Sequence, residues 1–161
     1  MPLLIALACV AAFLTLACVG VAIAHRRGAG AVIYGLTLLI SLVGLGAALV
    51  QLVVGTTAPA VTLPLGLPWL GAHLRMDALS AFFLVVVDLG AAAASLFAIG
   101  YGTHETAPER VLPFYPAFLA AMTLVVLADD AFTFLVSWEF MSLSWRCRRR
   151  SRPPASSKPM G

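Results

Sequence analysis

The chain alternates long apolar stretches with short polar breaks. Three stretches of membrane-spanning length are almost free of charge and cover residues 3–24, 31–55 and 78–100. A fourth, residues 111–128, confines Pro113 and Pro116 to its opening turns, where a helix tolerates proline. Because a helix crosses a bilayer with about 17 to 25 residues, the pattern predicts four complete transmembrane helices.

A fifth apolar stretch, residues 131–145, falls short of that length. It predicts a truncated fifth helix at the end of a helical membrane domain that covers residues 1–145. The chain then changes to RCRRRSRPPASSKPMG, residues 146–161, in which arginine, serine and proline dominate. We expect this basic tail to be disordered.

Two explanations of the basic tail stay open. The abrupt change of composition after residue 145 is typical of a reading-frame shift or a truncated gene. Alternatively, the tail is an authentic cytoplasmic anchor that holds a shortened helix through attraction to anionic lipid.

The segment between the second and third predicted spans is neither charged nor helical in pattern. Residues 61–77 read VTLPLGLPWLGAHLRMD, with apolar residues at alternate positions and a glycine and prolines near the middle. This alternation indicates a short β-hairpin on the outer membrane face. An unstructured apolar loop remains the alternative.

Composition agrees with a membrane protein. Hydrophobic residues make up 61% of the 161 residues, charged residues only 11%, and the mean hydropathy is +1.00. A soluble domain carries roughly 25% charged residues. The fold class predicted is therefore an all-α integral membrane protein that contacts the lipid bilayer.

The distribution of basic residues, the spacing of the cysteines and the absence of cofactor motifs argue against nucleic-acid binding, metal sites and cofactors. Six of the ten basic residues follow residue 145, so no basic face is available for nucleic acid. The three cysteines have neither CxxC nor metal-ligand spacing, which predicts no metal site. No flavin, quinone-specific, haem or iron–sulfur signature is present, and we expect no cofactor.

Basic residues also predict the orientation. Arg26 and Arg27 follow the first span and Arg110 follows the third, whereas Arg75 stands alone on the other side. Cytoplasmic loops are richer in Lys and Arg. We therefore expect a multi-pass protein of the cell inner membrane, with its N-terminus outside and its C-terminus cytoplasmic.

Two carboxylates fall at mid-membrane depth. Asp88 lies about 16 Å along the helix axis from Asp77, and Glu139 lies about 13 Å from Asp130. A carboxylate inside a membrane costs free energy, and proton relays contain such residues. Glu139 and Asp88 are therefore the candidate proton-pathway residues, with a neutral, hydrogen-bonded acid as the structural alternative for each.

Three other acidic residues precede predicted helices. Asp77 stands before the third span, and Asp129 and Asp130 stand before the fifth helix. Aspartate at a helix start accepts hydrogen bonds from exposed backbone N–H groups. We expect helix capping at all three positions, and no catalytic residue.

Longer motifs resemble a known family. RMDALSAFFL at 75–84, YPAFLAAMTLVVLADDAFTFLVSWEFMSL at 115–143 and the hairpin-like segment resemble the antiporter-like proton-conducting membrane subunits. That family includes large membrane subunits of respiratory complex I, Mrp-type antiporters and membrane subunits of hydrogenase-4 and formate hydrogenlyase. FLVSWEFMSLS is most similar to the hydrogenase-4 component B branch.

The resemblance implies a larger protein than this chain. It implies about fourteen helices, and it implies that Glu139 pairs with a lysine on the seventh helix in the proton path. The only lysine here is Lys158, in the tail. The family pattern offers no counterpart for Asp88.

Two functional readings follow. In the first, the chain is the N-terminal part of a proton-translocating subunit of a redox-coupled complex of the hydrogenase-4, formate hydrogenlyase or NADH:quinone oxidoreductase type, and does not conduct protons alone. Its partners are then other membrane and peripheral subunits of a respiratory or hydrogenase complex, and the redox chemistry lies in those subunits. In the second, it is a small multi-span protein with an assembly or interaction role and no transport.

Overall fold

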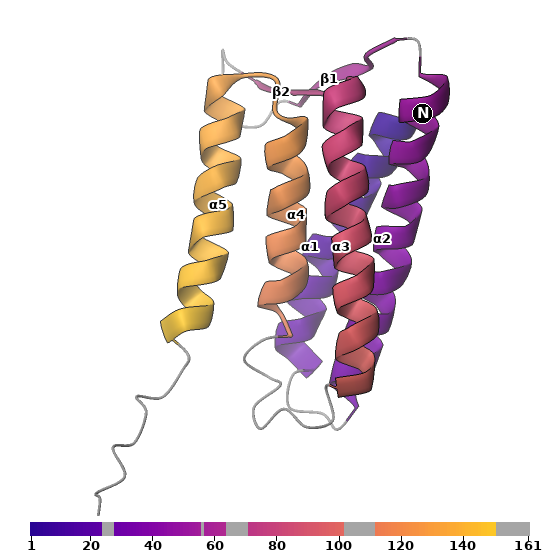
Figure 1. The fold of residues 1–161 in the computed structure, drawn as a ribbon. Helices are drawn as coiled ribbons and strands as arrows, with labels where there is room; N and C mark the ends of the chain where they lie inside the picture. Colours follow the sequence, from indigo (N-terminus) through magenta and orange to yellow (C-terminus); the bar gives the residue numbers. More distant parts are fainter. Residues whose placement is uncertain (24–27, 56, 64–70, 102–111, 151–161) are drawn as a thin grey trace, which may run out of the picture.

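The structure is a computed structural model that describes residues 1–23, 28–55, 57–63, 71–101 and 112–150. The elements, in chain order, are α1 (Pro2–Ile23), α2 (Ala29–Val54), β1 (Ala60–Leu63), β2 (Ala72–Arg75), α3 (Ala78–Tyr101), α4 (Phe114–Leu127) and α5 (Ala131–Arg150). Figure 1 shows the helices side by side with the two strands across one end, which we call the hairpin end.

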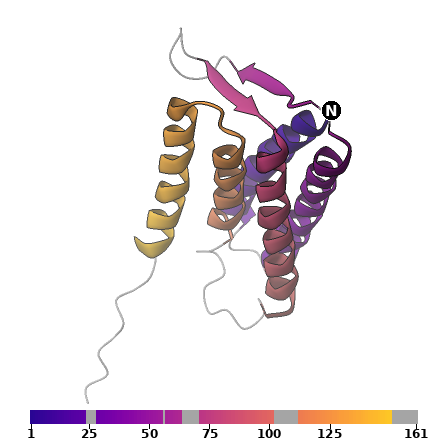
Figure 2. The ribbon, with the colours of Figure 1, turned by 45° about the horizontal axis from the view of Figure 1, so that its top comes forward.

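The first four helices close into a ring. α1 packs on α2, α2 on α3, α3 on α4, and α4 back on α1. α5 packs on α4 at the edge of this bundle, and α4 lies between α5 and α3 in both ribbon views (Figures 1 and 2). The ring therefore has an interior, whereas α5 has one helical neighbour and an open face.

Three apolar layers fill the ring from end to end. The hairpin-end layer contains buried Leu3, Ala6, Ala48, Leu74, Met76, Ala81, Leu84 and Leu127. The middle layer contains Val10, Phe13, Ala91, Leu119 and Ala120. The layer at the opposite end contains Leu16, Ala29, Ile33 and Leu112. Small residues alternate with large ones across these layers, so that the helices approach closely.

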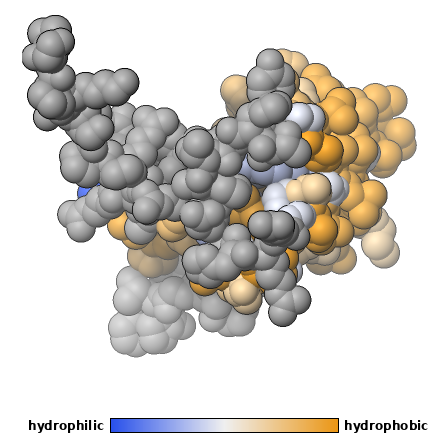
Figure 3. Space-filling model, turned by 90° about the horizontal axis from the view of Figure 1, so that it is seen from below, coloured by the Kyte–Doolittle hydropathy of each residue, from blue (hydrophilic) through white to orange (hydrophobic). Residues whose placement is uncertain are grey.

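Three helices are long and apolar enough to cross a membrane: α1, α2 and α3. The sequence predicted four, but α4 is only 14 residues long. It begins after Pro113, and Ala128 leaves the helix with extended backbone angles to bridge Leu74. The outer surfaces of the helices are strongly apolar, as the orange side of Figure 3 shows from the end opposite the hairpin.

α5 extends further than its apolar residues predict. It continues from Ala131 to Arg150, beyond residue 145 and into the basic segment. Arginine is a good helix former, so the change in polarity does not interrupt the backbone hydrogen bonding. The expectation for residues 151–161 lies outside the described residues.

The predicted β-hairpin is confirmed. β1 and β2 pair antiparallel, with Val61 opposite Leu74 and Leu63 opposite Ala72. Leu74 is buried in the hairpin-end layer, so the hairpin contributes to the core. Residues 64–70, which include Leu65 and Leu67, lie outside the described residues.

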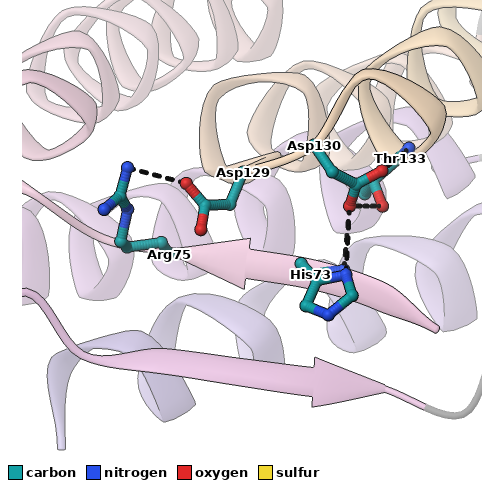
Figure 4. A network of polar contacts seen from close by, with 5 residues as sticks. All are labelled: His73, Arg75, Asp129, Asp130 and Thr133. Atoms are coloured by element: carbon teal, nitrogen blue, oxygen red, sulfur yellow. Dashed lines mark hydrogen bonds and ion pairs between the residues drawn. The ribbon is translucent and has the colours of Figure 1, made fainter. Parts of the chain in front are cut away.

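The second strand also binds the turn between α4 and α5 (Figure 4). Arg75 Nη2 lies 2.7 Å from Asp129 Oδ1, and Asp129 N–H donates to His73 O at 3.0 Å. His73 N–H donates to Asp130 Oδ2 at 3.1 Å. These contacts, together with the bridge between Leu74 and Ala128, attach the start of α5 to the loop that precedes α3.

Asp77 and Asp130 accept N-cap hydrogen bonds at the helices that follow them. Ser80 N–H donates to Asp77 Oδ1 at 2.7 Å, and Thr133 N–H donates to Asp130 Oδ1 at 2.8 Å. Asp129 instead forms the ion pair with Arg75. The bond from Ser80 holds the pKa of Asp77 below its ordinary value.

Acid should weaken the attachment of β2 to the start of α5. Hydrogen bonds from the Thr133 side chain and backbone, and from His73, lower the pKa of Asp130 from 3.8 to about 2. A carboxyl group whose pKa is lowered by folding stabilises the fold above its ordinary pKa, and that contribution is lost as the pH falls through the folded value. We expect the Asp129 N–H, bonded to His73 O, to lose hydrogen-exchange protection between about pH 4 and pH 2.

At each pH, the measured exchange rate of the Asp129 N–H is divided by the rate of an unprotected amide at that pH, because the unprotected rate itself depends on pH. Asp130→Asn is the control, because its single amide oxygen still accepts the hydrogen bond from Thr133 N–H at the start of α5 but does not titrate. In the variant, the protection of the Asp129 N–H should stay constant across this pH range. Constant protection in the wild type as well would contradict the prediction.

Candidate functional site

Asp88 lies inside the bundle, between α3 and α2. Its side chain is 5% exposed. A Cβ atom placed on Gly44 of α2 would lie 2.6 Å from Asp88 Oδ2 and 3.1 Å from its Cγ. Real Cβ atoms do not approach another atom to 2.6 Å, so the carboxyl group occupies the space that only glycine leaves on α2.

The Asp88 carboxyl group has few polar neighbours. Among the described residues, no hydrogen-bond donor and no basic side chain contacts it. The Cys9 thiol of α1 is within electrostatic range, and Cys9 Sγ also lies 3.8 Å from Ile40 O. One turn of α2 before Gly44, Ser41 is fully buried, and its hydroxyl has no partner in the described part of the chain.

Further polar side chains follow the same interface away from the hairpin end. On α3, Ser95 Oγ lies 3.0 Å from the Tyr115 hydroxyl of α4. Tyr115 OH donates to Ala91 O at 3.0 Å, so its single proton is used and Ser95 is the donor to Tyr115. On α2, buried Thr37 donates to Ile33 O at 2.8 Å. We call Ser41, Asp88, Ser95, Tyr115 and Thr37 the polar seam.

The interface is apolar in the other direction. Between Asp88 and the hairpin end lie Ala47 and Ala48 of α2 and Ala81 and Leu84 of α3, all buried. At the end of α2, Gln51 Nε2 donates to Thr57 O at 2.9 Å and to Met76 O at 3.4 Å. Polar groups near the hairpin end are thus separated from Asp88 by a closed apolar layer.

Glu139 lies on the open side of α5. Its side chain is exposed, and so is the neighbouring Trp138, whose ring stacks on Phe134 at 5.9 Å between centroids. Small polar residues occupy buried positions on α5: Thr133, Ser137 and Ser144. Glu139 therefore points away from these buried positions, toward space that other protein or lipid would fill.

The structure does not bring together the two carboxylates that the sequence predicted at mid-membrane depth, because α4 separates α5 from α3 (Figure 1). Neither residue lines the cleft of about 470 Å³ near the hairpin. That cleft is bounded by Arg75, Asp77, Leu79, Ser80, Phe83, Val125, Val126, Ala128, Asp129 and Phe134. Within the described residues, no group of three or more His, Cys, Asp or Glu side chains is placed to hold a metal ion.

Sequence reasoning missed Ser41 and Gly44. Helical spacing puts Ala81, Leu84 and Ser95 on the same face of α3 as Asp88, and all three are buried with it. The partner helix required a different signal. Thr37, Ser41, Gly44 and Gln51 recur at three-, four- and seven-residue intervals in an otherwise apolar helix, which marks one polar and small face.

The comparisons with known proteins cover only part of the chain. No protein-family profile matches it. An uncharacterised protein of Mycobacterium tuberculosis is 36% identical over 78 residues, which is 48% of this chain and 12% of that protein, and the same match occurs in two strains. Hydrogenase-4 component B of Escherichia coli is 38% identical over 73 residues, 44% of this chain and 11% of the relative.

In each case the match spans little more than a tenth of the relative's own length. The matches support a distant relation between this chain and hydrogenase-4 component B. They agree with the apolar helices in indicating a membrane protein.

Gly44→Ala should destabilise the bundle because the new methyl group would overlap the Asp88 carboxyl. Overpacking of this kind costs about 1–3 kcal/mol. Gly46→Ala is the matched control on the same helix, since a Cβ at Gly46 meets nothing within 4 Å. Gly46→Ala should be neutral or stabilising by up to about 1 kcal/mol, through helix propensity. Unfolding in mixed micelles, followed by circular dichroism, measures both.

A double variant tests whether the overlap with Asp88 is the cause of the lost stability. Asp88→Ala in the Gly44→Ala background should recover part of the loss, so that the two changes are not additive. Equal effects of Gly44→Ala and Gly46→Ala would show that the contact does not limit the packing of α2 on α3.

Proposed function

We propose that this chain is the N-terminal part of a proton-translocating membrane subunit of a redox-coupled complex, of the hydrogenase-4, formate hydrogenlyase or NADH:quinone oxidoreductase type. The observation that carries the proposal is the 38% match to hydrogenase-4 component B. The apolar helices and the carboxylates at Asp88 and Glu139 support it, because intramembrane carboxylates are typical of proton relays.

Glu139 is the proposed proton-exchanging residue of α5. Its exposure in this chain argues for a covering element, because an intramembrane carboxylate that faces lipid costs at least about 2.5 kcal/mol. We propose that other helices of a complete subunit cover this face and supply a basic partner, as the resemblance to antiporter-like subunits implies. The chain alone then conducts no protons.

Asp88 is a second proposed proton-pathway residue, on independent grounds. It is buried within the ring of α1–α4, and the described residues give it no cation. Its neutral form is the state that burial in an apolar bundle favours. Gain and loss of one proton is therefore the chemistry open to it.

The proposed setting is the cell inner membrane, with the N-terminus and hairpin outside and the end of α5 in the cytoplasm. The excess of arginine in the segments that would then be cytoplasmic supports this orientation. The proposed partners are membrane and peripheral subunits of the complex, which hold the redox groups.

Replacing Glu139 with glutamine should abolish proton movement without disrupting the complex. Glutamine keeps the size and hydrogen-bonding capacity of glutamate but cannot release a proton. In inverted membrane vesicles energised with hydrogen, formate or NADH, proton uptake should fall at least about tenfold, since each factor of ten is about 1.4 kcal/mol in a barrier. Glu105→Gln, the same chemical change outside the predicted spans, is the matched control.

Two other outcomes count against the proposal. Full proton uptake in Glu139→Gln, at normal levels of the complex, would exclude a proton-exchanging role for Glu139. A lower amount of the complex, with unchanged proton uptake per complex, would favour the assembly or interaction role instead.

A further inference from the structure

We propose that the ring of α1–α4 contains a proton-binding site of its own, in which Asp88 and Ser41 share a water molecule and exchange protons with the end of the bundle opposite the hairpin. This inference rests on the proposed proton-exchange function of Asp88 and deepens it by naming the ligand, the second residue and the side of access.

Ser41 and Gly44 lie one turn apart on α2, and from this spacing we infer that one water molecule can bridge Ser41 and Asp88. Gly44 contacts the carboxyl group, and Ser41 lies one turn earlier, about 4.5 Å along the helix axis. Two hydrogen bonds to one water molecule span up to about 5.5 Å between the outer oxygens. Both groups require a partner, because the Ser41 hydroxyl is buried with none and a buried carboxyl group without one is costly.

The available oxygens select a proton over a metal ion. The side chains of the site offer the two carboxyl oxygens of Asp88 and the one hydroxyl oxygen of Ser41. Hard cations such as calcium and magnesium need about six or more oxygen ligands. A proton needs one carboxyl oxygen, and a water molecule is satisfied by two to four polar partners.

The surrounding charges do not compensate an ionised Asp88. Among the described side chains of α1–α4, the other ionisable groups are Cys9 and Cys18 on α1, Tyr34 on α2 and Tyr115 on α4, and none is basic. Cys9 lies within electrostatic range of the carboxyl group, and Tyr115 is engaged with Ser95 and Ala91. Ionisation therefore requires release of the proton to water rather than transfer to a fixed cation.

The polar seam determines the side of access. Away from the hairpin end, Ser95 follows Asp88 two turns later on α3 and is bonded to Tyr115 of α4, and on α2 Thr37 lies one turn from Ser41. Toward the hairpin, the buried side chains of Ala48, Ala81 and Leu84 offer no hydrogen-bonding group. A proton moves along hydroxyl groups and water, so the seam extends the proposed path from Asp88 away from the hairpin, as far as the apolar layer of Leu16, Ala29, Ile33 and Leu112.

Infrared spectroscopy of the full chain in lipid nanodiscs tests the site. A protonated carboxyl group gives a carbonyl band that vanishes on ionisation. In a Glu139→Gln background, which removes the other intramembrane acid, we expect a band at mildly acidic pH that is lost as the pH rises. The band should be absent in Glu139→Gln/Asp88→Asn, whose neutral side chain keeps the shape that fits against Gly44.

Each alternative result overturns the proposal. A band that is removed by Asp88→Asn but persists at every pH would identify a permanently neutral structural acid. Spectra that Asp88→Asn leaves unchanged would show that Asp88 is never protonated. Circular dichroism of both proteins confirms that the comparison is between folded chains.

The route is tested by the rate at which the same band shifts when water is replaced by deuterium oxide. Tyr115→Phe and Ser95→Ala remove hydroxyl groups of the seam and should slow the shift by about tenfold. Ser137→Ala removes a buried hydroxyl of α5, outside the seam, and should leave the rate unchanged. Equal rates in all variants would exclude the seam as the path.

Failure of the infrared test can be distinguished from failure of the proposed function. The infrared titration uses the isolated chain and requires no redox partner, whereas Glu139→Gln is assayed by proton uptake in the complex. If Glu139→Gln does not change proton uptake, the infrared titration of Asp88 still tests the proton-binding site. If Asp88 shows no titrating band, the proton-uptake result for Glu139 still stands.

Discussion

The Asp88 carboxyl group lies directly against Gly44, where α2 packs on α3. Both helices are apolar enough to cross a membrane, and their interface holds the most polar buried side chain of the ring. Glycine leaves room for the carboxyl group without separating the helices. The small residues on either side of Asp88 are buried as well, with Ala81 in the hairpin-end layer and Ala91 in the middle layer.

Sequence patterns predicted the elements and the α3 face that carries Asp88, but not the α2 residues that face Asp88. The apolar stretches predicted the helices, the alternation in residues 61–77 predicted the hairpin, and helical spacing is enough to put Ser95 on the Asp88 face of α3. The partner side of the Asp88 site depends on how α2 rotates toward α3, which a single helix pattern does not determine. Gly44 was accordingly found only in the folded chain, although its spacing with Ser41 and Gln51 was present in the sequence.

The lengths of the last two helices show a different limit of the sequence pattern. Apolar composition extended the fourth helix to residues 111–128, but pairing between Leu74 and Ala128 ends α4 at Leu127. Composition ended the fifth helix at residue 145, but backbone hydrogen bonding continues α5 to Arg150. Hydrophobicity reports where a chain can contact lipid, whereas helix ends depend on caps, proline and tertiary hydrogen bonds.

The peripheral position of α5 has a consequence for biogenesis. α1 to α4 contact one another in a closed ring, and all three apolar layers are complete without a residue of α5. During synthesis these four helices can therefore assemble as soon as α4 has been inserted, with the hairpin already seated on them through Leu74. α5 then joins this bundle through its contacts with α4 and β2, and its outer face stays open.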